Sequence, residues 1–299
     1  NNLFTLCHLI YTDTFYMKRK WIRWVSWILL TPIILFVILM VLLYVPPVQN
    51  LLRREVTAYA SKVTGMQIQV ERIDLRFPLN LLVRGVEVIQ QPDTLLSLES
   101  LNVRVQAWPL IKGKVEVDEV TLSRVAVNSA DLMEGMKIKG VLGRFFLQSH
   151  GVDLSNELAV INQVELSDTH MQLLMNDTTT TPKDTTASAP INWKVALHQL
   201  KLKNVSFSMQ LPADSMRMAA HIGEAAIDDA QADLKNQYYD LKKFLLSGTS
   251  ASYDTGTAQP TEGFDASHIA VRDIRIALDS LLYKGRDMNA VIREFTMNE

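Results

Sequence analysis

The hydrophobic pattern of the chain begins with an uncharged run over residues 24–45, WVSWILLTPIILFVILMVLLYV. A helix needs about 20 apolar residues to cross a hydrocarbon core of roughly 30 Å, and this run reaches that length. Aromatic rings stand at both of its ends, where Trp and Tyr favour the membrane interface. The pattern predicts a single transmembrane anchor. Its selected residues are Trp24, Trp27, Leu35, Phe36, Leu42 and Tyr44.

The charges that flank this run predict its orientation. Lys18, Arg19, Lys20 and Arg23 precede the run, and uncharged residues 46–50 follow it. An excess of Lys and Arg marks the cytoplasmic side. A cleaved signal peptide is disfavoured, because its apolar region spans about 7–15 residues and ends at a small-residue cleavage site. We therefore expect a cytoplasmic N-terminus, and the chain from residue 46 onward on the other side of the membrane.

Helical spacing continues directly after the anchor. Apolar residues recur between Val48 and Val63 at intervals of three and four, and Gly65 is typical of a helix end. We expect an amphipathic helix over residues 46–65. Its apolar stripe either packs on the first strands, which we favour because most such helices bury that stripe against protein, or lies on the lipid surface.

From Met66 onward the period changes to alternation, in short runs rich in Val, Ile and Leu that predict β-strands. One pattern recurs. An apolar residue is followed by two other residues, then by two apolar residues with one residue between them, then by two more residues, after which the alternation resumes. We call each pair of intervening residues a step. Clear copies begin at Val117, Ile161 and Leu197, and weaker ones at Leu241 and Val271. We interpret them as repeated, kinked strands in a quasi-repetitive β architecture; coincidence within an ordinary all-β domain is the alternative.

The second step of each repeat is filled by polar pairs, such as Ser123-Arg124, Ser167-Asp168, Lys203-Asn204 and Ser247-Gly248. A two-residue step moves the following side chains to the other face of a strand unless a bulge absorbs it. Polar pairs of this kind suit a bulge or a tight turn. Each repeated strand is therefore expected to kink at this pair.

These patterns divide the chain into four parts. Residues 1–16 are expected to be an upstream or cytoplasmic segment, because Met17 and the basic residues after it resemble a start. Residues 17–45 form the basic flank and anchor, residues 46–65 the amphipathic helix, and residues 66–299 the repetitive β region. Within the last part, residues 176–190 and 254–266 have few apolar side chains and are expected to be loops.

Composition and motifs argue against several functions. The formal net charge of −2 gives no reason to expect a nucleic-acid partner. The sole cysteine, Cys7, precedes the anchor, so the exported part has no disulfide and no thiolate metal site. The chain has no phosphate loop, HExxH or GxSxG motif, and its six histidines lack ligand spacing. We expect surface histidines, a turn or exposed strand end at Asp228-Asp229, no cofactor and no enzymatic activity.

The apolar faces of these strands must be covered, and one amphipathic helix is too little to cover them. The sheet therefore closes on a core of its own or leaves an apolar trough. A trough lined with Val, Ile, Leu, Phe and Met suits acyl chains, because each buried methylene gains about 0.8 kcal/mol. The residue pattern leaves both alternatives open.

The order of a basic flank, an anchor, PPVQNLLRREVTAYASKVTGMQIQVERIDLRFPLNLLVRGVEV and DTLLSLESLNVRVQAWPLIKGKVEVDEVTLSRVAV resembles the N-terminal part of the AsmA-like family. Within that family it resembles the TamB (translocation and assembly module) branch, over residues 18 to about 128. The resemblance implies a single-pass protein of the bacterial inner membrane with its bulk in the periplasm. It also implies a mainly β fold, in which a repetitive antiparallel sheet curls into an open groove or tube.

Two functions follow as expectations. The first is conduction of phospholipid between the inner and outer membranes. Its expected path is lined by Val120, Leu122, Val164, Leu166, Leu200, Leu202 and Phe207. The second is a scaffold for outer-membrane protein assembly, with an outer-membrane β-barrel partner that the resemblance implies and with strand edges that are templates for pairing.

Overall fold

The structure is a computed structural model that describes residues 31, 34, 38, 41, 44–77, 79–111, 116–129, 135–153, 157–175, 192–256, 263 and 265–298. Of the selected anchor residues only Tyr44 is among them; Trp24, Trp27, Leu35, Phe36 and Leu42 lie outside, and the anchor stays a prediction. Within the described part, no helix is both long and apolar enough to cross a bilayer. By its internal contacts the chain divides into two units, residues 1–51 and 52–299.

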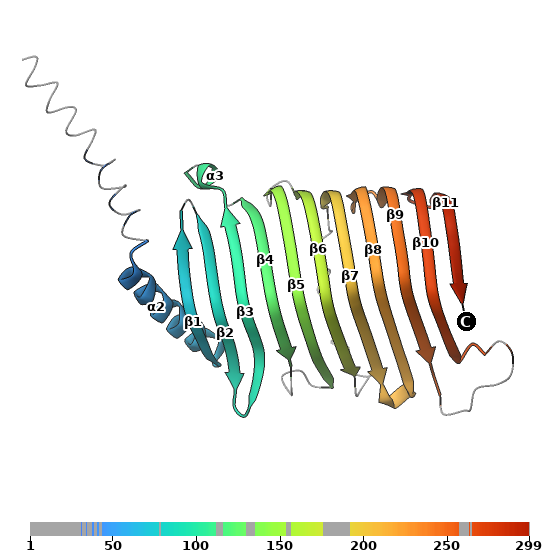
Figure 1. Ribbon diagram of the computed structural model, residues 1–299, viewed down its shortest axis with the longest axis horizontal. Helices are drawn as coiled ribbons and strands as arrows, with labels where there is room; N and C mark the ends of the chain where they lie inside the picture. Colours follow the sequence, from blue (N-terminus) through green and yellow to red (C-terminus); the bar gives the residue numbers. More distant parts are fainter. Residues whose placement is uncertain are drawn as a thin grey trace, which may run out of the picture. The chain divides into compact units, whose positions relative to one another are not determined.

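The second unit is mainly β and holds one open sheet of eleven strands (Figure 1). Within the described residues, the continuous helices are α2 (Pro46–Thr64), which begins in the first unit, and α3 (Ala107–Ile111). The short strands come first: β1 (Gln67–Arg76), β2 (Asn80–Gln90), β3 (Asp93–Val105) and β4 (Val117–Asn128). Longer strands follow: β5 (Met136–Asp153), β6 (Leu158–Met175), β7 (Lys194–Leu211), β8 (Met216–Asp233), β9 (Tyr238–Asp254) and β10 (His268–Lys284). The last described strand is β11 (Asp287–Asn298), and a 3-10 turn, Pro212–Asp214, joins β7 to β8.

The strands lie in the sheet in the same order as in the sequence, so each strand pairs with its neighbours along the chain. Residues 136–147, where glycines interrupt the apolar alternation, form the first part of β5. Nine of the ten pairings are antiparallel.

The expectation of a wholly antiparallel sheet is wrong at one place, because β6 and β7 are parallel. Two strands that run the same way need a connection of about a dozen residues or more to return along the sheet. Residues 176–193 supply that length. The two repeats are aligned by the parallel register, which pairs Ile161 with Leu197 and Thr169 with Val205.

Helix α2 does not bury its apolar stripe on the strands, contrary to the arrangement that we favoured. Its polar side contacts β1 instead: the Arg53 guanidinium donates to the carbonyl of Glu71 at 2.8 Å, and the Ile68 N–H donates to the Ser61 hydroxyl at 3.1 Å. These bonds occupy backbone groups on the edge strand of the sheet. No described residue of α2 is buried. The helix ends as expected at Gly65, whose φ is +70°.

The sheet has little closed core. Its buried apolar residues are Ile73, Leu95, Leu98, Ala159, Leu211, Ala225 and Ala277. No large side chain among the described residues is fully buried. Extensive contacts between elements of the described part occur only between neighbouring strands. A packed second layer against the sheet would bury large side chains, so the described residues form a single layer.

Candidate functional site

The strand pairing gathers the apolar residues into continuous rows that run across the sheet, perpendicular to the strands. Residues directly opposite each other in a ladder lie on the same face. One row is Leu75, Leu81, Val103, Val120, Leu147, Val164, Leu200, Ile227, Phe244, Leu278 and Ile292. The next row is Ile73, Val83, Leu101, Leu122, Phe145, Leu166, Leu202, Ala225, Leu246, Ile276 and Phe295. We call this side of the sheet the apolar face.

All seven residues of the expected path lie on the apolar face. Val120, Val164 and Leu200 share the first row, and Leu122, Leu166 and Leu202 share the second. Phe207 lies on a further row with Met171 and Ala220. The expected path draws only on β4, β6 and β7, and row residues of the other described strands, such as Leu147 of β5 and Ile227 of β8, were not among it. Alternation of Phe145 with Leu147 was the available signal in β5.

The apolar face stays apolar along each strand because the polar pairs of the repeats include one residue with a left-handed backbone. Arg124, Asp168, Asn204 and Gly248 have positive φ at this step; Gly85 in β2, and Asp273 in the first step of the copy that begins at Val271, also have positive φ. Each adds one residue to the alternation, so the apolar side chains before and after it point to the same face. At these pairs, where we expected a bulge or a tight turn, the structure has left-handed residues, and the strands continue through them.

These left-handed residues and the residues opposite them form one line across the sheet, which we call the kink line. From β1 to β9 the pairing register is the same on both sides of this line. Neighbouring strands therefore each contain the extra residue at the same place. A β-bulge, by contrast, sets two residues of one strand against one of its partner. Asn204 and Asp168 occupy facing positions on this line, and the Asn204 amide donates to the Asp168 carboxylate at 2.7 Å.

Close backbone approach on the kink line explains two glycines. A Cβ at Gly223 would lie 2.7 Å from the carbonyl oxygen of Gly248, and a Cβ at Gly143 would lie 2.7 Å from the Asp168 Cβ. Both distances are far below van der Waals contact. Glycine at these positions lets the neighbouring strands take the left-handed step side by side.

Most side chains of the apolar face are half-buried or exposed, and Ile73 and Ala225 are its buried members in the two rows. Val120, Leu122, Val164, Leu166, Leu200 and Leu202 are half-buried. Phe207 is 38% exposed and Met171 is 45% exposed. Residues of a closed core have almost no exposure, and contiguous apolar patches of this extent are uncommon on monomers. Within the described residues, the side chains of the apolar face therefore contact neighbours on adjacent strands, and no second layer covers them.

The opposite face of the sheet is mostly polar, with exposed apolar exceptions such as Val141 and Leu245, and has its own paired side chains. Asp229 also has a left-handed backbone. It lies in the middle of β8, away from the kink line, where we expected a turn or a strand end. Its carboxylate lies 3.0 Å from His198 Nδ1 on β7. The step between Ile227 and Ala230 repeats the geometry of the kink line, which is why a pair of aspartates can lie within a strand.

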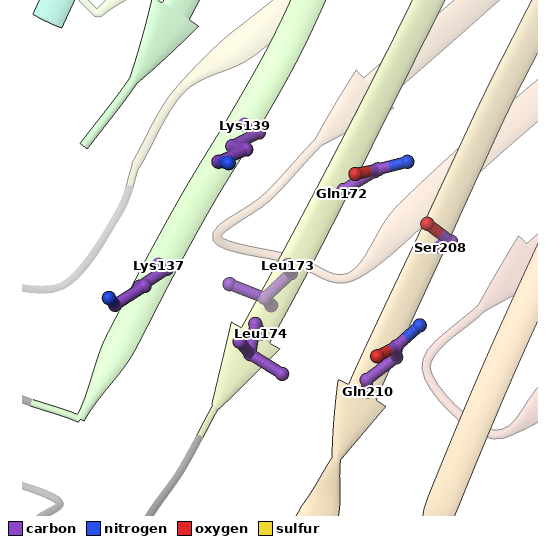
Figure 2. A pocket seen from close by; sticks show the side chains of 7 residues that line it. All are labelled: Lys137, Lys139, Gln172, Leu173, Leu174, Ser208 and Gln210. Carbon is purple, nitrogen blue, oxygen red and sulfur yellow. The ribbon is translucent and has the colours of Figure 1, made fainter. Parts of the chain in front are cut away.

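A shallow hollow of about 230 Å³ lies on the polar face, lined by Lys137, Lys139, Gln172, Leu173, Leu174, Ser208 and Gln210 (Figure 2). Its lysines come from β5 and its Ser and Gln side chains from β6 and β7. Gln172 and Ser208 are paired across β6 and β7, one position from the apolar row of Phe207. The hollow therefore lies mainly on the polar face, and its lining also includes Leu173, which pairs with Met209 beside the apolar row of Phe207.

The described histidines have local partners. His150 bonds Asn162, His170 bonds Gln172, and His221 bonds Ser206. His268 differs from the expected surface histidine, because its side chain is only 16% exposed and lies between Asp254 and Asp265. Across the described part of the chain, no three His, Cys, Asp or Glu side chains are arranged to hold a metal ion.

Comparison with known proteins gives no family: no protein-family model matches the chain, and no curated protein matches it. The resemblance to the AsmA-like family stays an expectation. The site is therefore defined by its geometry, which is an open sheet with continuous apolar rows on one face.

Proposed function

We propose that this protein is a membrane-anchored sheet that conducts phospholipid between the inner and outer membranes of a bacterial envelope, with its β region in the periplasm. The observation that carries the proposal is the continuity of the apolar rows across all eleven strands, without a covering layer among the described residues. The following paragraphs give its physical basis.

The rows have the direction and length that a lipid path needs. Neighbouring strands lie about 4.8 Å apart, so a row that crosses eleven strands extends roughly 48 Å. This distance exceeds the hydrocarbon thickness of a bilayer, about 30 Å. A phospholipid on this face keeps its acyl chains on the rows and its headgroup in water. Curling of the sheet into a groove would surround the chains further and belongs to the proposal.

The energetics favour sliding over tight binding. Each methylene removed from water gains about 0.8 kcal/mol, wherever along the row it rests. The two rows that contain Leu200 and Leu202 consist of aliphatic and aromatic side chains and hold no charge. Without fixed polar partners along these rows, one position is not strongly preferred over the next. The apolar face then works as a path, and no residue has a catalytic role.

The test is phospholipid bound to the protein purified from membranes, measured by mass spectrometry. Phe207→Asp and Leu202→Asp place a carboxylate on the apolar face and should remove most of the bound lipid. Ser208→Asp places the same charge on the polar face, one residue from Phe207, and should leave the lipid in place. Equal lipid in all three variants, with unchanged circular dichroism, would count decisively against conduction.

A second candidate, a scaffold for outer-membrane protein assembly, is favoured by β11. Among the described strands β11 pairs only with β10, and an unpaired strand edge is a template for a client strand or a β-barrel partner. Its side chains Met288, Val291 and Phe295 are exposed. Disulfide trapping between a cysteine at Arg293 and a nascent outer-membrane strand, in protein free of lipid, would favour this function over conduction.

A further inference from the structure

Helix α2 is oriented with its polar side toward the protein and its apolar side away from it. Arg53 and Ser61 contact the backbone of β1, as described above. The apolar residues Leu52, Val56, Tyr59 and Val63 are spaced by four, three and four positions, which places them on one helix face. A helix that packs by its apolar side has the reverse arrangement. The contacts with β1 therefore direct the apolar stripe outward.

The stripe is among the most exposed apolar surfaces of the described chain. Tyr59 is 71% exposed, Val63 is 66% exposed and Val56 is 47% exposed. Removing these four side chains from water is favourable, because burial of apolar surface stabilises. An exposed stripe of this kind marks a surface that another apolar phase covers.

We propose that this stripe rests on the surface of the lipid bilayer, with α2 lying in the interface. The position of the helix along the chain identifies the occupant. The apolar run ends at Val45 and α2 begins at Pro46, so the helix starts where the predicted anchor leaves the membrane. Tyr59 is a side chain that favours the interface, and Lys62 stands beside the stripe as a long cation able to reach phosphate groups. This placement rests on the anchor of the proposed function.

The consequence is that α2 joins the first strand to the membrane surface. The same helix holds β1 by its polar side and lipid by its apolar side. The edge of the sheet at β1, where the apolar rows begin with Leu75 and Ile73, is thereby kept next to the headgroups. A lipid that leaves the bilayer at this point has a short distance to travel to the first row.

The experiment places an environment-sensitive fluorophore on single cysteines in the full-length chain carrying Cys7→Ser. The protein is reconstituted in vesicles of phosphatidylethanolamine and phosphatidylglycerol that contain brominated acyl chains. Labels at Val56 and Val63 should be quenched on the order of twofold or more, because interfacial helices sit about 5–10 Å into the headgroup and acyl boundary. Matched labels at Ser252, on the polar face of β9, and at Arg54 of α2 should be quenched less.

The outcomes are distinct. Labels at Val56 and Val63 that behave like the label at Ser252 overturn the inference. Labels that are shielded from a water-soluble quencher and untouched by brominated lipid indicate a protein partner or a second copy, and overturn it too. The lipid bound to the sheet, measured in the same preparation, decides the conduction proposal separately: Leu202→Asp should leave the quenching at Val56 unchanged.

Discussion

The Asn204 amide donates to the Asp168 carboxylate at 2.7 Å across the parallel pair β6 and β7, and both residues have a left-handed backbone, with φ of +54° and +51°. Asn and Asp tolerate this region better than other non-glycine residues. Their hydrogen bond links β6 and β7 on the kink line, at the parallel pair of the sheet.

Asn204→Val should lower the free energy of unfolding by about 1–3 kcal/mol, because a β-branched residue in the left-handed region is strained. Asn204→Gly removes the hydrogen bond but relieves the backbone, and should cost about 1 kcal/mol or less. Urea unfolding followed by circular dichroism measures both. Lys203→Val, at the adjacent residue whose φ is not positive, is the control and should change little. Equal losses for Asn204→Val and Lys203→Val would show that the backbone conformation is unimportant.

Gly223→Ala should destabilise the pairing of β8 and β9. The new methyl group would lie 2.7 Å from the Gly248 carbonyl oxygen, and neither group is the end of a flexible side chain. Overpacking of this kind costs typically 1–3 kcal/mol. Ser252→Ala, an exposed position of β9, should stay within about 0.5 kcal/mol of the unaltered protein. A stability for Gly223→Ala equal to that of the control would mean that the two strands stand further apart.

Met171 and Val141 provide a matched test of which face meets lipid. Met171 lies on the apolar face and is 45% exposed; Val141 lies on the opposite face, across the β5–β6 ladder, and is 53% exposed. A photoreactive amino acid at Met171 should crosslink phospholipid in membranes, and the same amino acid at Val141 should not. Because the two side chains are similarly exposed, a difference in crosslinking yield reports which face of the sheet meets lipid. Comparable yields at both positions would remove the assignment of the apolar face as the lipid side.

We expect the turn between β8 and β9 to be sensitive to acid, because the Asp233 carboxylate stabilises it. The backbone N–H and side-chain amide of Asn236 donate to its carboxylate at 3.1 and 2.8 Å, and these bonds lower the pKa of Asp233 from 3.8. A carboxyl group whose pKa is lower in the folded state stabilises the fold above the unfolded pKa, and this contribution is lost as the pH falls through the folded pKa. Asp233→Asn should therefore reduce the loss of stability below about pH 4. An unchanged acid limb of the stability profile would contradict this role.

The repeat was readable from the sequence because its physical basis is local. Alternation with period two identifies a strand, and the polar pairs that interrupt it, such as Lys203-Asn204, predict where the strand kinks. The seven path residues were chosen from these repeats, and they lie on one face because the steps occur at facing positions. The contribution of β5 was harder to foresee, because glycines such as Gly140 and Gly143 weaken its pattern.

Two features depended on information that a strand pattern does not hold. The parallel pairing of β6 and β7 follows from the length of the connection between Met175 and Lys194, and alternation is the same for either direction. The inverted contact of α2 follows from Arg53 and Ser61 finding free backbone groups on β1. Periodicity identified the stripe of that helix but gave no preference for which side meets the sheet.

The kink line also restricts how such a chain can change its length. A one-residue deletion near Asn204 would leave its neighbours with their extra residue, and every side chain beyond it would project from the wrong side of the sheet. Insertions and deletions within strands must consequently occur together in adjacent strands, whereas a whole hairpin can be added or lost without disturbing the alignment. Growth by duplication of complete strand pairs is the change in length that this architecture accepts most readily.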